Sequence, residues 1–198
     1  MQIEYYYTLM SPWAYLGSQR FYALKKKYNF KIIHNPLDHR KLFSITGGVP
    51  LAKRSKQRKE YRIMELERWK EILETPLNIN PKYFPPSDII IPSCMILALE
   101  NEESQNHLAQ KFLEYVWVKD KDLGNKLHII EACKECNLEA EELFNSYIKF
   151  VEKFESLAEK AADINVFGSP SYVIDSEVFW GQDRLELLER KLKKGNKN

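Results

Sequence analysis

Within the first fifty residues, the spacing of apolar side chains switches between the pattern of a strand and the pattern of a helix. Alternating apolar positions in residues 1–9 predict a β-strand, and apolar positions three and four residues apart predict a helix over residues 12–28. A second short strand is expected over residues 30–35, where Pro36 ends it. The strand–helix–strand order predicts a parallel βαβ unit. Residues 42–50 contain two glycines and a proline and are expected to form a loop.

The middle of the chain keeps only the helical spacing. A charged helix is expected over residues 53–72, followed by a proline-rich connector over residues 81–86. Further helices are then expected over residues 88–100, 104–118, 125–136 and 139–162. Because this block has no convincing strand pattern, we expect residues 51–163 to form an all-helical insertion domain.

The strand spacing returns near the C-terminus. Strands are expected over residues 171–174 and 178–180, joined by a short turn, and a last helix over residues 183–193. Residues 1–50 and 164–198 are therefore expected to form one discontinuous domain. The pattern alone predicts an α/β fold interrupted by a large helical insertion.

Composition and charge narrow the class of protein. The 198 residues are 44% hydrophobic and 29% charged, which suits a globular fold. The 30 basic residues nearly balance the 28 acidic ones, and the net charge of +2 argues against a nucleic-acid partner. No basic and apolar leader opens the chain, and no apolar stretch is long enough to span a bilayer. We therefore expect a cytoplasmic protein without membrane contact, and the three cysteines fit a reducing compartment.

Ser11 and Pro12 mark the junction between the first strand and the first helix. Serine is a preferred N-cap residue, and proline is tolerated at the first helical position. The serine hydroxyl then lies beside free backbone N–H groups at the positive end of the helix dipole, which suits an anion. From these residues alone, a structural cap is the simpler interpretation and an anion site is the alternative.

Three motifs, taken together, resemble those of the 2-hydroxychromene-2-carboxylate isomerase family. They are SPWAYLG at residues 11–17, VFGSPSYV at residues 166–173 and FWGQDRL at residues 179–185. That family comprises bacterial relatives of kappa-class glutathione transferases, with the DsbA-like thioredoxin fold. The resemblance implies a thioredoxin-like α/β fold with a large all-helical insertion, glutathione as the cofactor, and a homodimer.

The resemblance also implies that Ser11 is the catalytic residue. Redox members of the fold place a C-x-x-C motif at this helix start, and the two cysteine positions correspond here to Ser11 and Ala14. No protein thiol is left at these positions for disulfide exchange. The helix N-terminus and the Ser11 hydroxyl are instead expected to hold the thiolate of a bound glutathione.

Further residues are implied to bind glutathione. Pro170 is expected to follow a cis peptide bond, with the backbone of Ser169 pairing with the cysteinyl part of glutathione. Asp183 and Arg184 are expected to bind the γ-glutamyl end, although Asp183 also fits a D-x-x-E cap of the last helix. Arg58 stands near the position of the family's lysine and is expected to supply a cation.

The rest of the site is less well defined by the sequence. The family's asparagine is expected near Gly48, where this chain has none. The basic run at residues 53–62 is interpreted as a solvated helix face, or alternatively as a region that attracts an anionic substrate. His39 is not placed by the sequence. The residues expected to line a substrate pocket are Pro12, Trp13 and Trp180.

Two classes of function follow. The first is a glutathione-dependent isomerase or a glutathione transferase that acts on a small aromatic or unsaturated substrate. The second is a redox-inactive thioredoxin-fold module that binds a peptide or protein in the groove beside the cis-proline. No metal site is expected, because Cys133 and Cys136 lie within a helical pattern and no second ligand pair is near in sequence.

Overall fold

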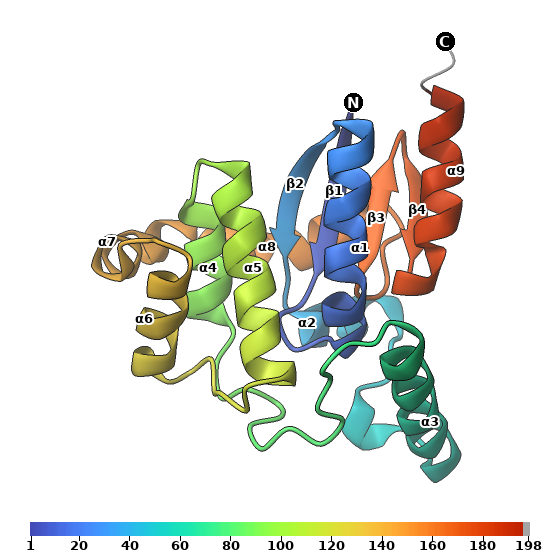
Figure 1. Ribbon diagram of the computed structural model, residues 1–198, viewed down its shortest axis with the longest axis horizontal. Helices are drawn as coiled ribbons and strands as arrows, with labels where there is room; N and C mark the ends of the chain where they lie inside the picture. The colour runs from blue at the N-terminus through green and yellow to red at the C-terminus, as the bar shows by residue number, and fades with distance from the viewer. Residues whose placement is uncertain (196–198) are drawn as a thin grey trace.

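A computed structural model describes residues 1–195 as a four-stranded mixed sheet with helices on both faces (Figure 1). The sheet order is β2-β1-β3-β4, with β1 parallel to β2 and antiparallel to β3. The strands are β1 Gln2–Tyr7, β2 Lys31–Pro36, β3 Ser171–Ile174 and β4 Glu177–Trp180. This arrangement confirms the α/β class, the parallel βαβ unit and the C-terminal hairpin. Residues 196–198 of the expected 164–198 segment lie outside the described residues.

Helices account for most of the remaining chain. Residues 51–163, all of which the structure describes, contain helices and loops and no strand. The same core cluster includes Ile3 of the sheet, Leu66 and Trp117, so sheet and helical segment share their packing and their division into two domains stays a prediction. The helices are α1 Pro12–Tyr28, α2 His39–Thr46, α3 Lys56–Ile72, α4 Ile90–Ala98, α5 Glu102–Trp117, α6 Lys126–Glu135, α7 Ala140–Ser146, α8 Val151–Asp163 and α9 Leu185–Gly195.

Helix α2 occupies residues 42–46 of the stretch that the sequence predicted to be a loop, so that prediction was wrong there and is confirmed only for residues 47–50. The carboxylate of Asp38 caps the helix by accepting from the backbone N–H of Arg40 at 2.8 Å. Leu42 is fully buried, and Gly47 ends the helix at φ 76°. The helix is only eight residues long, and its apolar stripe is correspondingly short.

The single helix expected over residues 139–162 was also wrong. The structure has α7, then a 3-10 turn at Tyr147–Phe150, then α8. Tyr147 and Phe150 pack against the buried clusters, so tertiary packing overrides a pattern that is continuous in sequence. The connector over residues 81–86 contains a cis peptide bond between Phe84 and Pro85 that the sequence did not predict.

The two faces of the sheet are buried by different helices. Tyr5 and Tyr172 on one face pack with Phe21 of α1 and Leu188 of α9. On the other face, Tyr6 and Val173 belong to the cluster that includes side chains of α2 and α8. Because successive residues of a strand point to opposite faces, the nearly unbroken apolar run in β1 serves both layers. The loop between β1 and α1, which holds Ser11, is thereby fixed at one edge of this sandwich.

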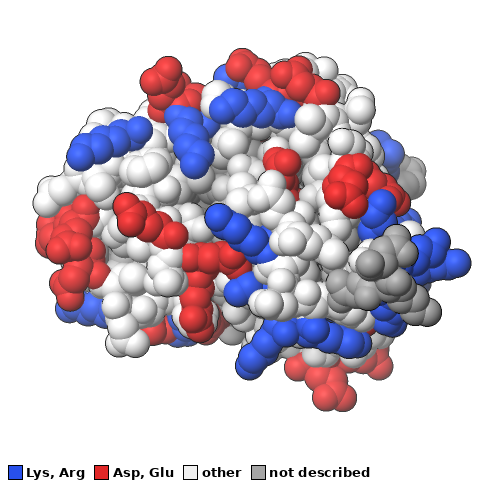
Figure 2. All heavy atoms as spheres, turned by 90° about the horizontal axis from the view of Figure 1, so that it is seen from above, with Lys and Arg blue, Asp and Glu red and all other residues white. Residues whose placement is uncertain are grey.

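Charged side chains are mixed in sign on the protein surface. Figure 2 shows lysine and arginine interspersed with aspartate and glutamate over the face seen from above. This agrees with the small net charge of +2. Within residues 1–195, no helix is both long and apolar enough to cross a membrane.

His34 on β2 is buried and fully hydrogen-bonded in its neutral form. The Tyr7 hydroxyl donates to Nδ1 at 2.9 Å, and the Nε2–H donates to Oδ1 of Asn106 at 2.8 Å. Burial is the main cause that lowers the pKa of His34 to about 4, outweighing the opposite effects of Asn106 and Glu102. In the unfolded chain the pKa returns to about 6.5.

We therefore expect acid to destabilise the protein through His34. Because the unfolded state binds this proton more readily, the free energy of unfolding falls as the pH drops from about 6.5 to about 4, by up to about 3 kcal/mol. Urea unfolding at several pH values measures this slope. The His34→Gln variant should show a flatter profile, and the exposed His107→Gln control should keep the wild-type slope. An unchanged slope in His34→Gln would contradict the assignment.

Candidate active site

Ser11 lies where two distant segments of the chain meet. Its Oγ accepts from the backbone N–H of Ala14 at 3.1 Å, which confirms the predicted N-cap of α1. The same hydroxyl donates to the backbone carbonyl of Ser169 at 3.3 Å. Ser11 is buried, and no acidic residue occupies the first turn of α1. The hydroxyl therefore stands in an electropositive setting, held by one hydrogen bond of ordinary length and one long one.

The turn before β3 faces Ser11. The bond between Ser169 and Pro170 is cis, as predicted. The Thr8 backbone N–H donates to Oγ of Ser169 at 3.0 Å, so this turn is tied to the end of β1. Gly168 lies against Trp180. A Cβ at this position would be 2.2 Å from the indole Nε1, so any other residue at position 168 would displace the indole ring.

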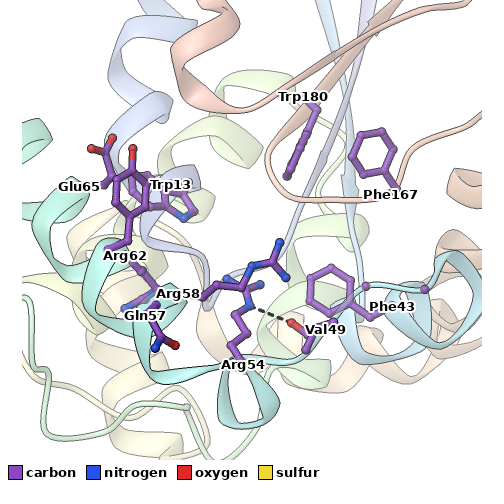
Figure 3. A pocket seen from close by; sticks show the side chains of 13 residues that line it. Trp13, Phe43, Val49, Arg54, Gln57, Arg58, Arg62, Glu65, Phe167 and Trp180 are labelled. Atoms are coloured by element: carbon purple, nitrogen blue, oxygen red, sulfur yellow. Dashed lines mark hydrogen bonds between the residues drawn. The ribbon is translucent and has the colours of Figure 1, made fainter.

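Ser11 opens onto a cleft between the sheet and helix α3, made of three adjoining chambers. A chamber of 110 Å³ lies beside Ser11, Pro12 and Ser169. A wide chamber of 570 Å³ lies along α3, and one of 400 Å³ extends to Asp183 and Arg184. All three are lined by Trp13, Phe43 and Arg54 (Figure 3).

Besides Arg184, three arginines of the basic run at residues 53–62 line the cleft, where the sequence had singled out only Arg58 within that run. In Figure 3 the side chains of Arg54 and Arg58 extend into the space between Trp13 and Phe43. Arg62 lines both the wide and the small chamber, and Arg54 donates to the carbonyl of Val49 at 2.9 Å. No carboxylate in residues 1–195 forms an ion pair with any of the three. The basic run at residues 53–62 is therefore not simply a solvated face.

Burial perturbs these cations. It lowers the pKa of Arg62 to about 10, and the nearby Arg54 adds to the effect. Burial followed by repulsion from Arg58 lowers the pKa of Arg54. Arg62 lies over the rings of Phe84 and Trp117, at 5.7 and 5.9 Å from their centroids. Both groups remain charged at neutral pH, so the cleft holds positive charge with little compensation.

Two buried polar atoms in the small chamber have no hydrogen-bond partner among the described residues. They are Oγ1 of Thr8 and Nδ1 of His39. Burial lowers the pKa of His39, so its ring is neutral near pH 7. Buried polar atoms are nearly always paired in proteins. These two groups therefore fit a chamber that receives a polar ligand.

The far end of the cleft holds Asp183 and Arg184. Their side chains pair at 2.8 Å, and Asp183 lies inside the 3-10 helix Gln182–Arg184. The alternative of a D-x-x-E cap was wrong, because α9 begins two residues later and Asp183 pairs with Arg184 instead. Trp180 packs edge-on against Phe167 with centroids 4.7 Å apart, and both rings are exposed.

The structure thus gathers the expected site residues around one cleft. Pro170 is buried behind the turn, and the other residues line the chambers; the roles assigned to them stay predictions. Sequence reasoning missed Phe43, Arg54, Arg62 and Thr8. The sequence does not predict Phe43 as a site residue, because it predicts a loop where α2 forms. The charged side chains of α3 follow no spacing that distinguishes the cleft face from the solvent face.

A mixed sheet with an inserted helical segment, and a capping serine opposite a cis-proline, defines a protein of the thioredoxin-fold class. Residues 2–193 match the family model of the DSBA-like thioredoxin domain, and the chain belongs to that family. This confirms the fold that the sequence motifs implied.

Two proteins of known name are similar to this chain over most of its length. A 2-hydroxychromene-2-carboxylate isomerase of Pseudomonas putida is 26% identical over 192 residues, covering 96% of this chain and 93% of the relative. Glutathione S-transferase kappa 1 of Rattus norvegicus is 21% identical, covering 94% and 88%. These relatives support a glutathione-related isomerase or transferase family, as the motifs indicated.

Solved structures agree on the fold. The structure of a 2-hydroxychromene-2-carboxylate isomerase matches with a TM-score of 0.82 at 21% identity, covering 98% of this chain and 95% of that one. A cytosolic disulfide reductase DsbM from Pseudomonas aeruginosa, in a structure with GSH, matches with a TM-score of 0.71 at 14% identity and complete coverage of both chains.

Proposed function

We propose that this protein is a cytoplasmic, homodimeric glutathione-dependent enzyme of the 2-hydroxychromene-2-carboxylate isomerase type, or a glutathione transferase for an aromatic or unsaturated substrate. The observation that carries the proposal is the Ser11 hydroxyl at the N-terminus of α1, facing the turn that contains Pro170. The named relatives, an isomerase and a kappa-class transferase, support it.

The residues present fit glutathione. Thr8 and His39 offer unsatisfied polar atoms beside Ser11. The chamber that ends at Asp183 and Arg184 offers a carboxylate for an ammonium group and a guanidinium for a carboxylate. Arg58 is a free cation at the opposite side of the cleft within the described chain, suited to a second carboxylate. Between the two charged ends of glutathione, the backbone of Ser169 is available to pair with the cysteinyl part.

The role of Ser11 in this proposal is to stabilise the negative charge on the sulfur of bound glutathione. When bound, glutathione supplies a thiolate as the nucleophile. The bond from the Ser11 hydroxyl to the Ser169 carbonyl is long at 3.3 Å, so the proton can turn toward the sulfur with little loss. The hydroxyl oxygen stays anchored because it keeps accepting from the Ala14 N–H. Ser11 and the helix N-terminus thereby lower the free energy of the charged form.

Neighbouring side chains position the second substrate. Arg54 and Arg62 supply positive charge for an acidic group next to Ser11. Trp13 and Phe43 provide apolar surface for an aromatic or unsaturated portion and exclude water from the sulfur. Disulfide exchange is not expected at this site, because the site has no protein thiol. Cys94 and Cys133 are buried elsewhere, and burial raises the pKa of each thiol to about 12.

The test is a calorimetric titration with reduced glutathione, paired with ultraviolet detection of thiolate. We expect binding in the millimolar range or tighter, with the bound thiol ionised at neutral pH. Ser11→Ala should retain binding and lose the thiolate signal, while the exposed Ser44→Ala control should behave as wild type. Absence of binding at millimolar glutathione overturns the proposal.

One observation favours the second candidate, a peptide-binding module. Phe167 and Trp180 form an exposed aromatic pair at the mouth of the cleft, a feature common to peptide-binding grooves. A stoichiometric peptide or protein ligand that glutathione cannot displace would replace the enzymatic proposal with this one.

A further inference from the structure

The proposed function requires a proton acceptor near Ser11. Free thiols are almost fully protonated at pH 7, so ionising the thiol of bound glutathione removes one proton from the sulfur. Ser11 cannot take that proton, because its hydroxyl is needed as a donor to the sulfur and its oxygen accepts from the Ala14 N–H. Water is a weak base, so a base in the small chamber speeds this transfer.

His39 is the one group lining the small chamber, within residues 1–195, that can both bind and release a proton near neutral pH. No aspartate or glutamate of the described chain lines this chamber, and Arg54 and Arg62 stay protonated. The remaining polar side chains there are hydroxyl groups and the indole of Trp13, which do not act as bases in this range. The two larger chambers do contain carboxylates, but those lie outside the small chamber.

The ring of His39 is held by packing. His39 is the first residue of α2, and its ring lies edge-on against Phe43 with the centroids 5.5 Å apart. Its Nδ1 is buried without a hydrogen-bond partner among the described residues. A neutral imidazole carries a lone pair on one nitrogen and a proton on the other. The ring can therefore accept a proton at one nitrogen and release one from the other.

His39 also lines a second cavity, which we call the side chamber. This cavity has a volume of 180 Å³, and Met10 and His39 line both it and the small chamber. Its wall includes the carboxylates of Asp38 and Asp88, and the exposed Ser87 places part of it at the protein surface. A proton on His39 thus has a route to water that does not pass through the cleft where a second substrate would lie.

Charged groups of both signs face His39. They come from α2, from α3 and from the segments that precede α3 and α4, and they are Asp38, Arg40, Arg54, Arg62 and Asp88. Burial has the largest effect and lowers the pKa of His39 from its ordinary value; Asp38 opposes this effect, and Arg40 and Arg54 add to it. A protonated ring therefore loses its proton readily at pH 7 and is ready for the next turnover.

We propose that His39 is the catalytic base of the small chamber, which takes the proton from the thiol of bound glutathione and passes it through the side chamber to water. The S–H bond breaks with its electron pair left on sulfur, and an N–H bond forms on the imidazole. Water in the side chamber then removes one proton from the ring, which ends neutral. This inference rests on the proposed function and adds a base to the site.

Proton release on glutathione binding tests this role without a second substrate. The protein is mixed rapidly with reduced glutathione at pH 7 in weak buffer, where a pH indicator follows the proton and ultraviolet absorbance follows the thiolate. His39→Gln keeps a polar side chain that cannot titrate, so we expect the wild-type yield of thiolate and a release about 100-fold slower. His107→Gln, exposed on α5, should match wild type. Release at the wild-type rate in His39→Gln overturns the proposal.

Rescue by imidazole separates a base from a structural residue. His39→Ala leaves a space beside the small chamber, so free imidazole should restore fast release in this variant and leave His107→Gln unchanged. In wild type, release should slow as the pH falls below the lowered pKa of His39, because a protonated ring cannot accept. His39→Gln should lack this pH dependence. A slow His39→Ala variant with full thiolate yield that imidazole does not accelerate overturns the proposal.

The same measurements separate this inference from the proposed function. A wild-type protein that binds no glutathione overturns both. A wild type that forms the thiolate, together with an equally fast His39→Gln variant, overturns the role of His39 and leaves the proposed function standing. A His39→Gln variant that binds glutathione but forms no thiolate at equilibrium also overturns it, since a proton carrier changes the rate and not the yield.

Discussion

Replacing Ser11 with alanine is expected to lower kcat/KM with glutathione about 100- to 1000-fold, the usual cost of removing one hydrogen-bond donor aimed at developing or stabilised charge. The loss should fall mainly on kcat, because binding of the peptide portion depends on the backbone of Ser169 and on Asp183 and Arg184 at the far end of the cleft, none of which the substitution removes. The same change removes the N-cap of α1, which accepts from Ala14, so the free energy of unfolding should fall by about 1 kcal/mol.

A second substitution separates the two roles of Ser11. Aspartate is an equally good N-cap, so Ser11→Asp should keep the stability of α1 while placing a negative charge beside the sulfur. We expect Ser11→Asp to be as inactive as Ser11→Ala but more stable, and Ser11→Thr, which keeps a hydroxyl, to recover most of the activity. Steady-state kinetics and thermal unfolding on the three variants provide the measurements. Full activity in Ser11→Asp would contradict the hydroxyl's role.

The second large effect is expected at Arg62. Arg62→Met preserves the contact with Phe84 and Trp117 and removes the buried cation, so kcat/KM for a substrate with a carboxylate should fall roughly 100-fold, mostly through KM. Turnover of an uncharged aromatic electrophile such as 1-chloro-2,4-dinitrobenzene should change little. The fold itself should become more stable, because burial and repulsion from Arg54 oppose the charge on Arg62.

Two controls define the result. Arg58→Met should weaken glutathione binding for both kinds of substrate, since Arg58 is expected to act on glutathione rather than on the second substrate. Arg190→Met lies outside the cleft, in α9, and should leave both activities unchanged. Equal losses with charged and uncharged substrates in Arg62→Met would show that Arg62 does not select for a carboxylate.

The sequence predicted the sheet and the position of Ser11 because both depend on short-range signals. Alternating side chains, a capping serine and a proline at the first helical position are readable within ten residues. The cis bond before Pro170 was predicted for another reason, namely the resemblance of the flanking motifs, since nothing local distinguishes that turn from an ordinary one.

What the sequence did not predict depends on packing between distant segments. Helix α2 is short, and its Phe43 lines the cleft together with residues far along the chain, such as Phe167 and Trp180. Arg62 was hidden in a basic run, because the side of α3 that faces the cleft is decided by where Leu66 is buried. Arg54 precedes α3 and ends the 3-10 helix Leu51–Lys53, which the sequence did not predict. Tertiary packing similarly breaks the helix expected over residues 139–162.

The contact between Ser11 and Ser169 joins residues that are 158 positions apart, and β3 lies between β1 and β4 in the sheet. On the ribosome, β1 must therefore wait for nearly the whole chain before its second neighbour emerges, a delay of about 8 to 30 s at ordinary rates of synthesis. Until then one edge of β1 lacks its partner strand. A chain that stops before Ser169 would thus complete neither the four-stranded sheet nor the small chamber beside Ser11.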